Sequence, residues 1–419
     1  MHPDPSKQYT TPVPPRIYMD ANATTPLLPE VFTAMRPFLL GEFGNPSSIH
    51  QGGQHARAAV ERARDQVARL LRARASEIVF TSGGTESDNL ALFGILRPGD
   101  HLVTTTSEHH AVLHAAHALE KRGVEVTYLP CTPAGLITPA SLAEALQPNT
   151  RLVSIMLANN ETGVIQPIAE LAHLAKNHGA HFHTDAVQAA GKLPLDLGLT
   201  CALSNPSGNL KDVDLLSISG HKMYAPQGTG VLFVRRQVQL TPLFHGGMHE
   251  RQRRAGTENV PGIVALGEAA DQASRWLGNP GVPPPASERW EKPPQNPQAL
   301  ATLRDTLEQS LLAAIPDSGV NGANAPRTPN TTNLFFDGID ADSLLIALDL
   351  AGLAVSAGSA CQSGATEPSH VLTAMGLPHA RAKASIRISL SRLTTSAEVA
   401  QATHLITEAV HRQRTTRNH

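Results

Sequence analysis

Short apolar runs alternate with helical patterns between about residue 77 and residue 235 of this chain. Alanine-rich helical stretches, such as Ile168 to His178, separate several of these runs. Strands that alternate with helices predict a largely parallel sheet with helices on both faces, which is the α/β fold class. In such sheets, ligands gather at the carboxyl ends of the strands. The seven predicted strands are 77–81, 101–105, 124–128, 152–156, 181–184, 214–218 and 231–234.

The C-terminal part of the chain predicts a second, smaller α+β domain. Thr332 to Phe336 and Ala384 to Leu390 are predicted strands, and Ala341 to Ala351 is a predicted helix. Two stretches have the composition of loops: 200–211, and 278–297, which is rich in Pro, Asn and Gly. The expected division is a flexible tail 1–15, a segment 16–26 packed with the small domain, a large domain 27–277, a connector or insertion 278–298, and a small domain 299–419 that carries a loop around Cys361.

Composition excludes several classes of function. The 419 residues include 34 Lys and Arg against 36 Asp and Glu, with no basic block, so direct nucleic-acid binding is not expected. The polar, proline-rich start is unlike a secretory signal, and there is no run of about 18 apolar residues, so a cytoplasmic protein without a membrane segment is expected. Three widely separated cysteines argue against a disulfide framework or a structural zinc site.

Lys222 ends the run Ser217-Ile-Ser-Gly-His-Lys and follows a predicted strand, while Asp185 ends an earlier one. A lysine that can form a Schiff base and a carboxylate that can keep a pyridine nitrogen protonated are the main requirements of a pyridoxal phosphate (PLP) site. Gln188, one helical turn beyond Asp185, could reach the phenolic oxygen of that cofactor. Taken singly, Lys222 could be a surface charge and Asp185 a helix cap.

Gly83-Gly84-Thr85 follows a strand and opens a helix. Free N–H groups at a helix start attract an anion, and glycine allows a phosphate to come close. Ser219 and His221 could bind the same phosphate. The alternative is an ordinary turn in which Thr85 is the N-cap.

His109 could stack on a pyridine ring and pass a proton, although a lone histidine is more often structural. His181 and His183 share one face of a strand, which would suit a metal, but no further ligand set accompanies them.

Arg387 lies on a predicted strand, where its guanidinium could bind a carboxylate or form a surface salt bridge. The residues that follow predicted strands directly are Thr85, His109, Asn160, Asp185 and His221.

Cys361 lies in Ser-Ala-Gly-Ser-Ala-Cys-Gln-Ser-Gly-Ala, where small residues on both sides offer little to anchor the segment. That composition favours a mobile loop with a nucleophilic thiol over a buried inert cysteine. Cys131 and Cys201 have no clear role.

Taken together, these residues resemble the cysteine desulfurases of the NifS/IscS type, which belong to the class V aminotransferase family of fold-type I PLP enzymes. The resemblance covers roughly residues 17 to 409. The segments that carry it are Tyr18-Met-Asp-Ala-Asn-Ala-Thr-Thr-Pro26, Phe43-Gly-Asn-Pro-Ser47, Phe80-Thr-Ser-Gly-Gly-Thr-Glu-Ser-Asp-Asn89, Ala158-Asn-Asn-Glu-Thr-Gly163, Ser219-Gly-His-Lys222, Gly246-Gly247, Arg254-Ala-Gly-Thr-Glu-Asn259 and Gly358-Ser-Ala-Cys361.

The resemblance implies a fold-type I transferase: a large domain with a mostly parallel seven-stranded sheet between helices, and a smaller α+β C-terminal domain. It also implies a role for each matched residue. Lys222 would hold PLP, Asp185 would pair with the pyridinium nitrogen, and Gln188 would bond the phenolic oxygen. His109 would stack on the ring and shuttle protons. The phosphate would be bound by Gly84, Thr85, Ser219, His221 and, from the other subunit of a homodimer, Thr257; the substrate carboxylate would be bound by Asn45, Asn160 and Arg387.

The implied reaction converts L-cysteine to L-alanine and leaves a persulfide on Cys361. An acceptor or scaffold protein would then take the sulfur for iron–sulfur cluster assembly or tRNA thiolation, and Cys361 could transiently ligate a shared cluster as a metal ligand. The alternatives are a selenocysteine lyase or another lyase of the same fold, or a non-catalytic scaffold. The chain ends at His419, without the extended tail of scaffold-docking members, which puts the usual docking in doubt.

Overall fold

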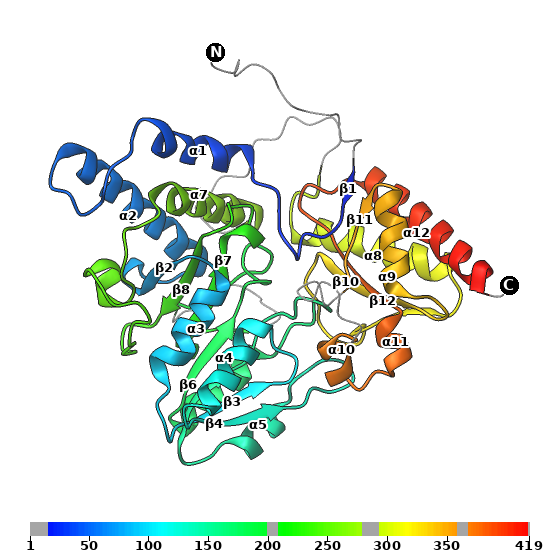
Figure 1. Cartoon of the computed structure of the whole chain (residues 1–419), viewed down its shortest axis with the longest axis horizontal. Helices are drawn as coiled ribbons and strands as arrows, with labels where there is room; N and C mark the ends of the chain where they lie inside the picture. Colours follow the sequence, from blue (N-terminus) through cyan, green and yellow to red (C-terminus); the bar gives the residue numbers. More distant parts are fainter. Residues whose placement is uncertain (1–15, 199–207, 279–292, 358–367, 418–419) are drawn as a thin grey trace.

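The computed structural model describes residues 16–198, 208–278, 293–357 and 368–417. Figure 1 shows two groups of elements side by side, one built on a large sheet and the other on a small one. The strands are β1 (Ile17–Tyr18), β2 (Ile78–Thr81), β3 (His101–Thr105), β4 (Glu125–Leu129), β5 (Thr150–Ser154), β6 (His181–Asp185), β7 (Leu215–Ser219), β8 (Gly230–Val234), β9 (Ser318–Val320), β10 (Thr331–Phe336), β11 (Leu353–Ala354) and β12 (Ser385–Ser389).

Helices account for most of the remaining described chain. The α-helices are α1 (Pro29–Leu40), α2 (Gln51–Leu71), α3 (Gly84–Ile95), α4 (His110–Glu120), α5 (Pro139–Ala145), α6 (Ile168–His178), α7 (Val260–Trp276), α8 (Pro297–Ala314), α9 (Ala341–Leu350), α10 (His370–Ala374), α11 (His379–Lys383) and α12 (Ser396–Arg417). Short 3₁₀ turns are η1 (Ala75–Glu77), η2 (Gly220–Lys222) and η3 (His249–Gln252).

The large sheet has seven strands in the order β2-β8-β7-β6-β5-β3-β4. Strands β7, β6, β5, β3 and β4 run parallel, whereas β8 is antiparallel to both of its neighbours. The α/β fold class and the mostly parallel seven-stranded sheet predicted from the sequence are confirmed. The largest shift is at β5, which begins at Thr150 rather than Leu152 because Thr150 pairs with His101 across a register irregularity.

Side chains of successive strand residues enter two different cores. Ile78, Phe80 and Phe233 belong to a cluster with residues of α1, α2, α6 and α7, whereas Val79 and Leu232 belong to one with α3 and α4. Because alternate residues of a strand point to opposite faces, the consecutive apolar residues Ile78–Phe80 of β2 and Val231–Val234 of β8 require helices on both faces. The sheet is therefore buried on both sides, and its carboxyl-end loops are left to form a site.

The small sheet, β12-β10-β9, is antiparallel and packs with α8, α9 and α12 around a third cluster. Ile17 and Met19 also belong to this cluster, and β1 pairs with β11. The predicted strands 332–336 and 384–390 and the predicted helix 341–351 correspond to β10, β12 and α9. The loop-like stretch 200–211 and the connector 278–297 lie mostly outside the described residues, and α8 begins at Pro297. The proposed domain boundaries remain predictions.

None of the helices within the described part of the chain is both long enough and apolar enough to span a bilayer.

Candidate active site

Lys222 lies at the carboxyl end of β7, in the 3₁₀ turn η2. Its Nζ donates hydrogen bonds to the backbone oxygens of Asn22 and Ala23, each at 2.6 Å. The turn requires glycine at position 220, because an added Cβ would lie 2.3 Å from Thr229 Oγ1. Lys222 therefore follows an apolar strand to the sheet edge, where its ammonium group donates hydrogen bonds to backbone oxygens of the N-terminal segment.

Asp185 ends β6, the strand next to β7, and is buried. Its Oδ1 accepts the Val187 N–H at 2.8 Å. Burial raises the pKa of Asp185 to about 6, against the opposing effects of the Val187 bond and the nearby Lys222 ammonium. A buried carboxylate and an amine thus interact at the carboxyl ends of adjacent strands, as the sequence pattern suggested.

Two further buried carboxyl groups lie near Asp185. Burial, and then the proximity of Asp185, raises the pKa of Asp88 well above its usual value. Burial raises the pKa of Glu108 to about 8, even though its Oε1 accepts the Met156 N–H at 2.8 Å. Protons are therefore held in the layer around Asp185, a feature that sequence reasoning missed.

The two histidines considered as metal ligands have other partners. His183 is fully buried between Ser154 (2.8 Å) and Ser217 (3.0 Å), and burial lowers its pKa to about 3. His181 contacts Asp214 at 3.3 Å. Within the described ranges, no group of three or more His, Cys, Asp or Glu side chains could hold a metal ion.

Gly83 and Gly84 pack closely against two strands at the start of α3. An added Cβ at Gly84 would lie 2.8 Å from Val187 Cγ2 and 3.6 Å from Ser219 Cβ, so this helix start faces the ends of β6 and β7. The N-cap of α3 is Gly83 rather than Thr85, which lies exposed in the first turn. The alternative in which Thr85 caps the helix is therefore wrong, and the N–H groups at the helix start face the same edge as Ser219.

His221 and His109 flank this edge as neutral rings. His221 Nδ1 lies 3.1 Å from Thr24 Oγ1, and burial together with Lys222 and Lys192 lowers its pKa to about 4. Burial, Lys222 and three other histidines lower the pKa of His109 to about 4. His109 Nδ1 accepts the Ala111 N–H at 3.1 Å at the start of α4, so its Nε2 carries the proton of the neutral ring.

Arg387 reaches the site from β12 and is almost fully buried. Its Nη2 bonds Asp20 Oδ1 at 2.8 Å and its Nη1 bonds the Asn160 backbone oxygen at 3.1 Å. Among the described residues, neither Arg387 Nε nor the buried Asn160 Oδ1 has a hydrogen-bond partner. The structure thus brings Arg387 and Asn160 together, with a guanidinium N–H that remains available to an acceptor.

Asn22 and Lys192 join these groups, and sequence reasoning gave neither a role. Gln188 Nε2 donates to Asn22 O at 3.1 Å, the same oxygen that receives Lys222. Lys192 Nζ bonds Gln188 Oε1 at 2.8 Å and Asn22 Oδ1 at 3.3 Å. The four-residue spacing of Gln188 and Lys192 could have indicated that their side chains lie on the same side of a helical turn and contact each other.

Three predicted site residues are not brought to this edge by the described contacts. Asn45 and Thr257 are exposed, and Asn45 lies in the loop between α1 and α2, where its side-chain oxygen accepts the Ser47 N–H. Cys361 lies outside the described residues, as does Cys201. Cys131 is half-buried, and burial raises the pKa of its thiol.

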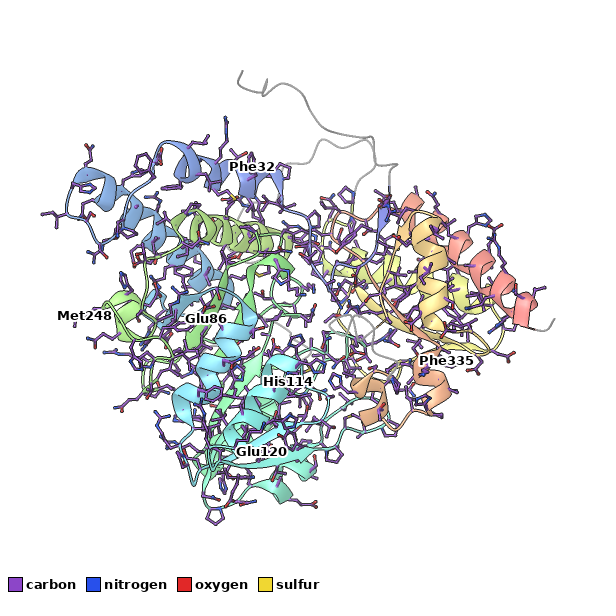
Figure 2. All side chains as sticks on the ribbon, viewed as in Figure 1. Phe32, Glu86, His114, Glu120, Met248 and Phe335 are labelled. Carbon is purple, nitrogen blue, oxygen red and sulfur yellow. The ribbon has the colours of Figure 1, made fainter. Side chains whose placement is uncertain are left out.

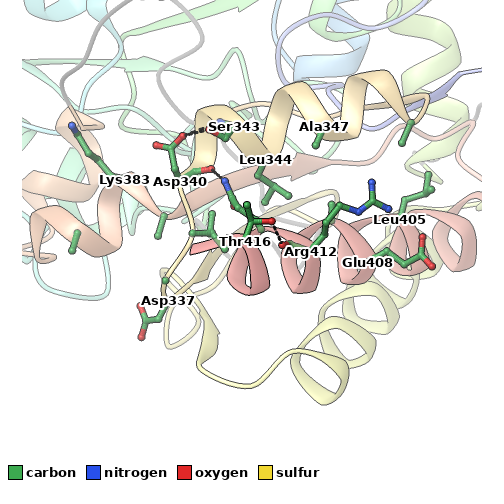
Figure 3. Close-up of a pocket in the computed structure, with 17 residues that line it drawn as sticks. Asp337, Asp340, Ser343, Leu344, Ala347, Lys383, Leu405, Glu408, Arg412 and Thr416 are labelled. Carbon is green, nitrogen blue, oxygen red and sulfur yellow. Dashed lines mark hydrogen bonds between the residues drawn. The ribbon is translucent and has the colours of Figure 1, made fainter. Parts of the chain in front are cut away.

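A separate pocket of about 770 Å³ lies between α9 and α12, and Asp337 and Asp340, just before α9, are among the residues that line it (Figure 3). Its lining comes from residues 337–351, 380–384 and 405–416, so it contains none of the residues of the candidate site.

The fold and the site define a class: an α/β protein with a buried carboxylate and a lysine at the carboxyl ends of adjacent strands. The aminotransferase class-V family model matches residues 17–401, and the chain belongs to that family. Cysteine desulfurase IscS of Methanosarcina thermophila is 44% identical over 402 residues, covering 95% of this chain and 93% of the relative. Cysteine desulfurase 2 of Trichormus variabilis is 46% identical over 401 residues, covering 95% and 94%.

Solved structures agree with the sequence relatives. A NifS-like protein superposes with a TM-score of 0.81 at 33% identity, covering 94% of this chain and 99% of that one. A structure described as SspA in complex with cysteine has a TM-score of 0.73 at 35% identity, covering 89% and 98%.

Proposed function

We propose that this protein is a PLP-dependent cysteine desulfurase. The observation that carries the proposal is the electrostatic interaction of Lys222 with buried Asp185 at the sheet edge, in a chain whose full-length relatives are named cysteine desulfurases. The fold alone would admit many activities, so the proposal depends on this site.

The described residues fit PLP. Lys222 would bind its aldehyde carbon, Asp185 its ring nitrogen and Gln188 its phenolic oxygen, while the start of α3 with Ser219 and His221 would bind its phosphate. The close approach of Gly84 to β6 and β7, which a Cβ would prevent, brings the start of α3 to the strand ends, where its backbone N–H groups would bind the phosphate. When bound, PLP would supply an electron sink for charge that develops at the substrate Cα.

The side chains of this chain would perform the proton transfers. Lys222 Nζ would take the proton from the substrate Cα, because the backbone oxygens of Asn22 and Ala23 hold this group at the sheet edge, near enough to Asp185 for the two charges to interact. His109 is neutral at physiological pH and carries its hydrogen on Nε2, so this N–H would donate a hydrogen bond to the ligand, and the ring would pass on a proton only after it has first accepted one. Arg387 would hold the substrate carboxylate through its available Nε–H.

Sulfur transfer would use Cys361. Its thiolate attacks the substrate sulfur, the substrate Cβ–S bond breaks and an S–S bond forms, so sulfur is oxidised to the persulfide level while Cβ is reduced to a methyl group. The proton lost by the Cys361 thiol balances the one gained at Cβ. The products are L-alanine and a persulfide on Cys361. An acceptor protein would take the outer sulfur of this persulfide for iron–sulfur cluster assembly or tRNA thiolation. Transient ligation of a shared cluster by Cys361 and a cytoplasmic location stay predictions.

A homodimer would complete the site. Asn45 and Thr257 are exposed beside one cavity, which Pro46, Ser47 and Glu258 line, so both could contribute to the site of a second copy. Leu40, Phe43, Ile49 and Met248 are also exposed on this side of the chain, and a group of exposed apolar residues favours an interface.

The function is tested by incubating the purified protein with L-cysteine and analysing it by mass spectrometry. We expect one added sulfur atom on Cys361 and an equal amount of alanine. Cys361→Ala should abolish both while PLP stays bound, and Cys131→Ala is the matched control that should change neither.

Sulfide release that persists in Cys361→Ala would instead favour a lyase that does not use this thiol, such as a selenocysteine lyase. A purified protein that takes up no PLP would favour a non-catalytic scaffold.

A further inference from the structure

Lys192 is a buried lysine that neither the sequence motifs nor the proposed proton transfers employ. The residue is 6% exposed, and its Nζ donates to Gln188 Oε1 at 2.8 Å and to Asn22 Oδ1 at 3.3 Å. The preceding Gly191 has a φ of +72°, which favours glycine and ends the turn that places Lys192 in the interior. Burying a lysine is costly unless it is well hydrogen-bonded, so its location calls for a reason beyond packing.

The bond from Lys192 decides which way the Gln188 amide faces. A lysine ammonium can only donate, so it selects the oxygen end of the amide, and the nitrogen end must face the other way. There, Gln188 Nε2 donates one of its two hydrogens to Asn22 O at 3.1 Å. In the opposite amide orientation, the Gln188 Nε2 donor would face the Lys192 ammonium, which is also a donor.

Lys192 also acts on the segment that receives Lys222. Asn22 Oδ1 accepts from Lys192 and from Asn330 Nδ2, at 3.3 and 3.0 Å, while Asn22 Nδ2 donates to Asn160 O at 3.1 Å. These bonds fix Asn22, whose backbone oxygen accepts from both Lys222 Nζ (2.6 Å) and Gln188 Nε2. Lys192 thus reaches the neighbourhood of Lys222 Nζ by two hydrogen-bonded routes.

We propose that Lys192 is a positioning residue that fixes the Gln188 amide and Asn22, so that Gln188 Nε2 is held as a donor beside Lys222 Nζ for an anionic oxygen of the ligand. This inference rests on the proposed function, in which that oxygen is the phenolate of PLP. Lys192 need not touch the ligand, because it acts through Gln188 and Asn22.

The charge of Lys192 makes this orientation depend on pH. Burial, with the cations Lys222 and Arg387, lowers the pKa of Lys192 to about 7, and Lys192 in turn helps to lower the pKa of His221. Below about pH 7 the ammonium enforces the amide orientation, whereas above it the neutral amine can accept a hydrogen bond and the selection weakens.

The test is an absorbance titration of the bound cofactor in the PLP-loaded protein between pH 6 and 9, without cysteine. We expect Lys192→Met to move the titration midpoint by about one pH unit, the size expected for losing one hydrogen bond to a charged group. The same loss should lower kcat roughly 10- to 100-fold. Lys176→Met, which removes a largely exposed lysine paired with Asp212, is the matched control and should leave both unchanged.

A double-mutant cycle separates positioning from general loss of packing. If Lys192 acts through Gln188, the variant with both Lys192→Met and Gln188→Ala should behave like Gln188→Ala alone, whereas independent effects would add. Additive effects, or a Lys192→Met titration that matches the wild type, would overturn the inference.

Lys192→Arg keeps a donor that stays charged throughout this range, so it should not show the displacement expected of Lys192→Met, and any change in its midpoint should have the opposite sign. This variant decides the matter where Lys192→Met does not fold: an arginine variant displaced as far as Gln188→Ala would also overturn the inference. A wild-type protein that forms no alanine from L-cysteine would instead overturn the proposed function.

Discussion

Glu108 shows how much a single buried group can influence this molecule. It lies beneath the candidate site, its Oε1 accepts the Met156 N–H at 2.8 Å and the Thr105 hydroxyl at 3.2 Å, and among the described residues its Oε2 has no partner. Burial raises its pKa to about 8. The folded protein therefore binds a proton at Glu108 in a pH range where the unfolded chain has released it.

We predict that Glu108→Gln removes part of the pH dependence of stability. Because the pKa of Glu108 is raised on folding, its stabilising effect is full below about pH 4.5 and is lost as the pH rises through 8. At pH 9 the variant should be more stable than the wild type by up to roughly 4 kcal/mol, and at pH 5 the two should be close. Urea unfolding of the PLP-free protein at the two pH values measures this difference.

Glu144→Gln, which alters an exposed carboxylate on α5, should give no such difference. Wild-type and Glu108→Gln stabilities that change in parallel from pH 5 to pH 9 would contradict the prediction.

At the residue scale, the sequence was most informative for side chains that follow strands. Lys222, Asp185 and His109 could be singled out because each stands next to a clear apolar run, and in the structure the Lys222 ammonium acts to lower the pKa of both Asp185 and His109. Asn22 and Lys192 could not, because their importance arises from contacts between residues about 170 positions apart. The protonation of Asp88 and Glu108 likewise depends on burial by distant elements.

At the element scale, η3 is a strained segment held by one buried ion pair. Glu250, Arg251 and Gln252 have φ values of 45°, 55° and 65°, a left-handed run that non-glycine residues rarely adopt. Arg64 of α2 binds Glu250 with two hydrogen bonds of 2.8 Å, and the Phe80 N–H donates to the same carboxylate at 3.0 Å. The Arg64–Glu250 pair thus fixes η3 at the edge of the sheet, together with the chain segment that leads from η3 to Thr257.

We predict that Glu250→Gln destabilises the protein by about 3 kcal/mol, because it leaves the buried Arg64 guanidinium with only the half-exposed Glu61 carboxylate as a counter-charge. The variant should also release PLP faster, if Thr257 completes the phosphate site as proposed. Chemical unfolding and the rate of cofactor loss on dilution measure the two effects.

Arg69, which is on α2 like Arg64, forms a more exposed pair with Asp271 of α7, and Arg69→Gln should cost less than about 1 kcal/mol. Equal destabilisation by the two variants would contradict the special role assigned to the Arg64–Glu250 pair.

Elements differed in how well the sequence predicted them. The seven strands of the large sheet were found within two residues because most of them are buried and rich in apolar residues, and each is bounded by helices or turn residues. β1, β9 and β11 were missed, since they have only two or three residues and exist through their pairing with distant strands. No local periodicity marks a strand that short.

At the scale of the whole molecule, several highly exposed apolar side chains of the described residues lie between the end of α1 and η3. Phe43 is 79% exposed, Ile49 93% and Met248 78%, and Met248 lies at the outer edge of the molecule in Figure 2. The Ser47 hydroxyl, 3.4 Å from His249 Nε2, joins the α1–α2 loop to η3. Asn45 and Thr257, which have no place in the site of their own chain, border this surface.

If the protein forms the homodimer proposed above, we predict that Phe43→Asp combined with Ile49→Asp converts it to monomers and abolishes alanine formation. A carboxylate in an apolar interface must be desolvated without a partner, which costs several kcal/mol per site and exceeds what a second copy could regain there. Because both positions are exposed within one chain, the fold should be unaffected, and circular dichroism should match the wild type. Sedimentation measures the association state.

Leu350→Asp, at another highly exposed position on α9, is the control and should leave a dimer. An active monomeric double variant would show that one chain holds a complete site, and that Asn45 and Thr257 act elsewhere.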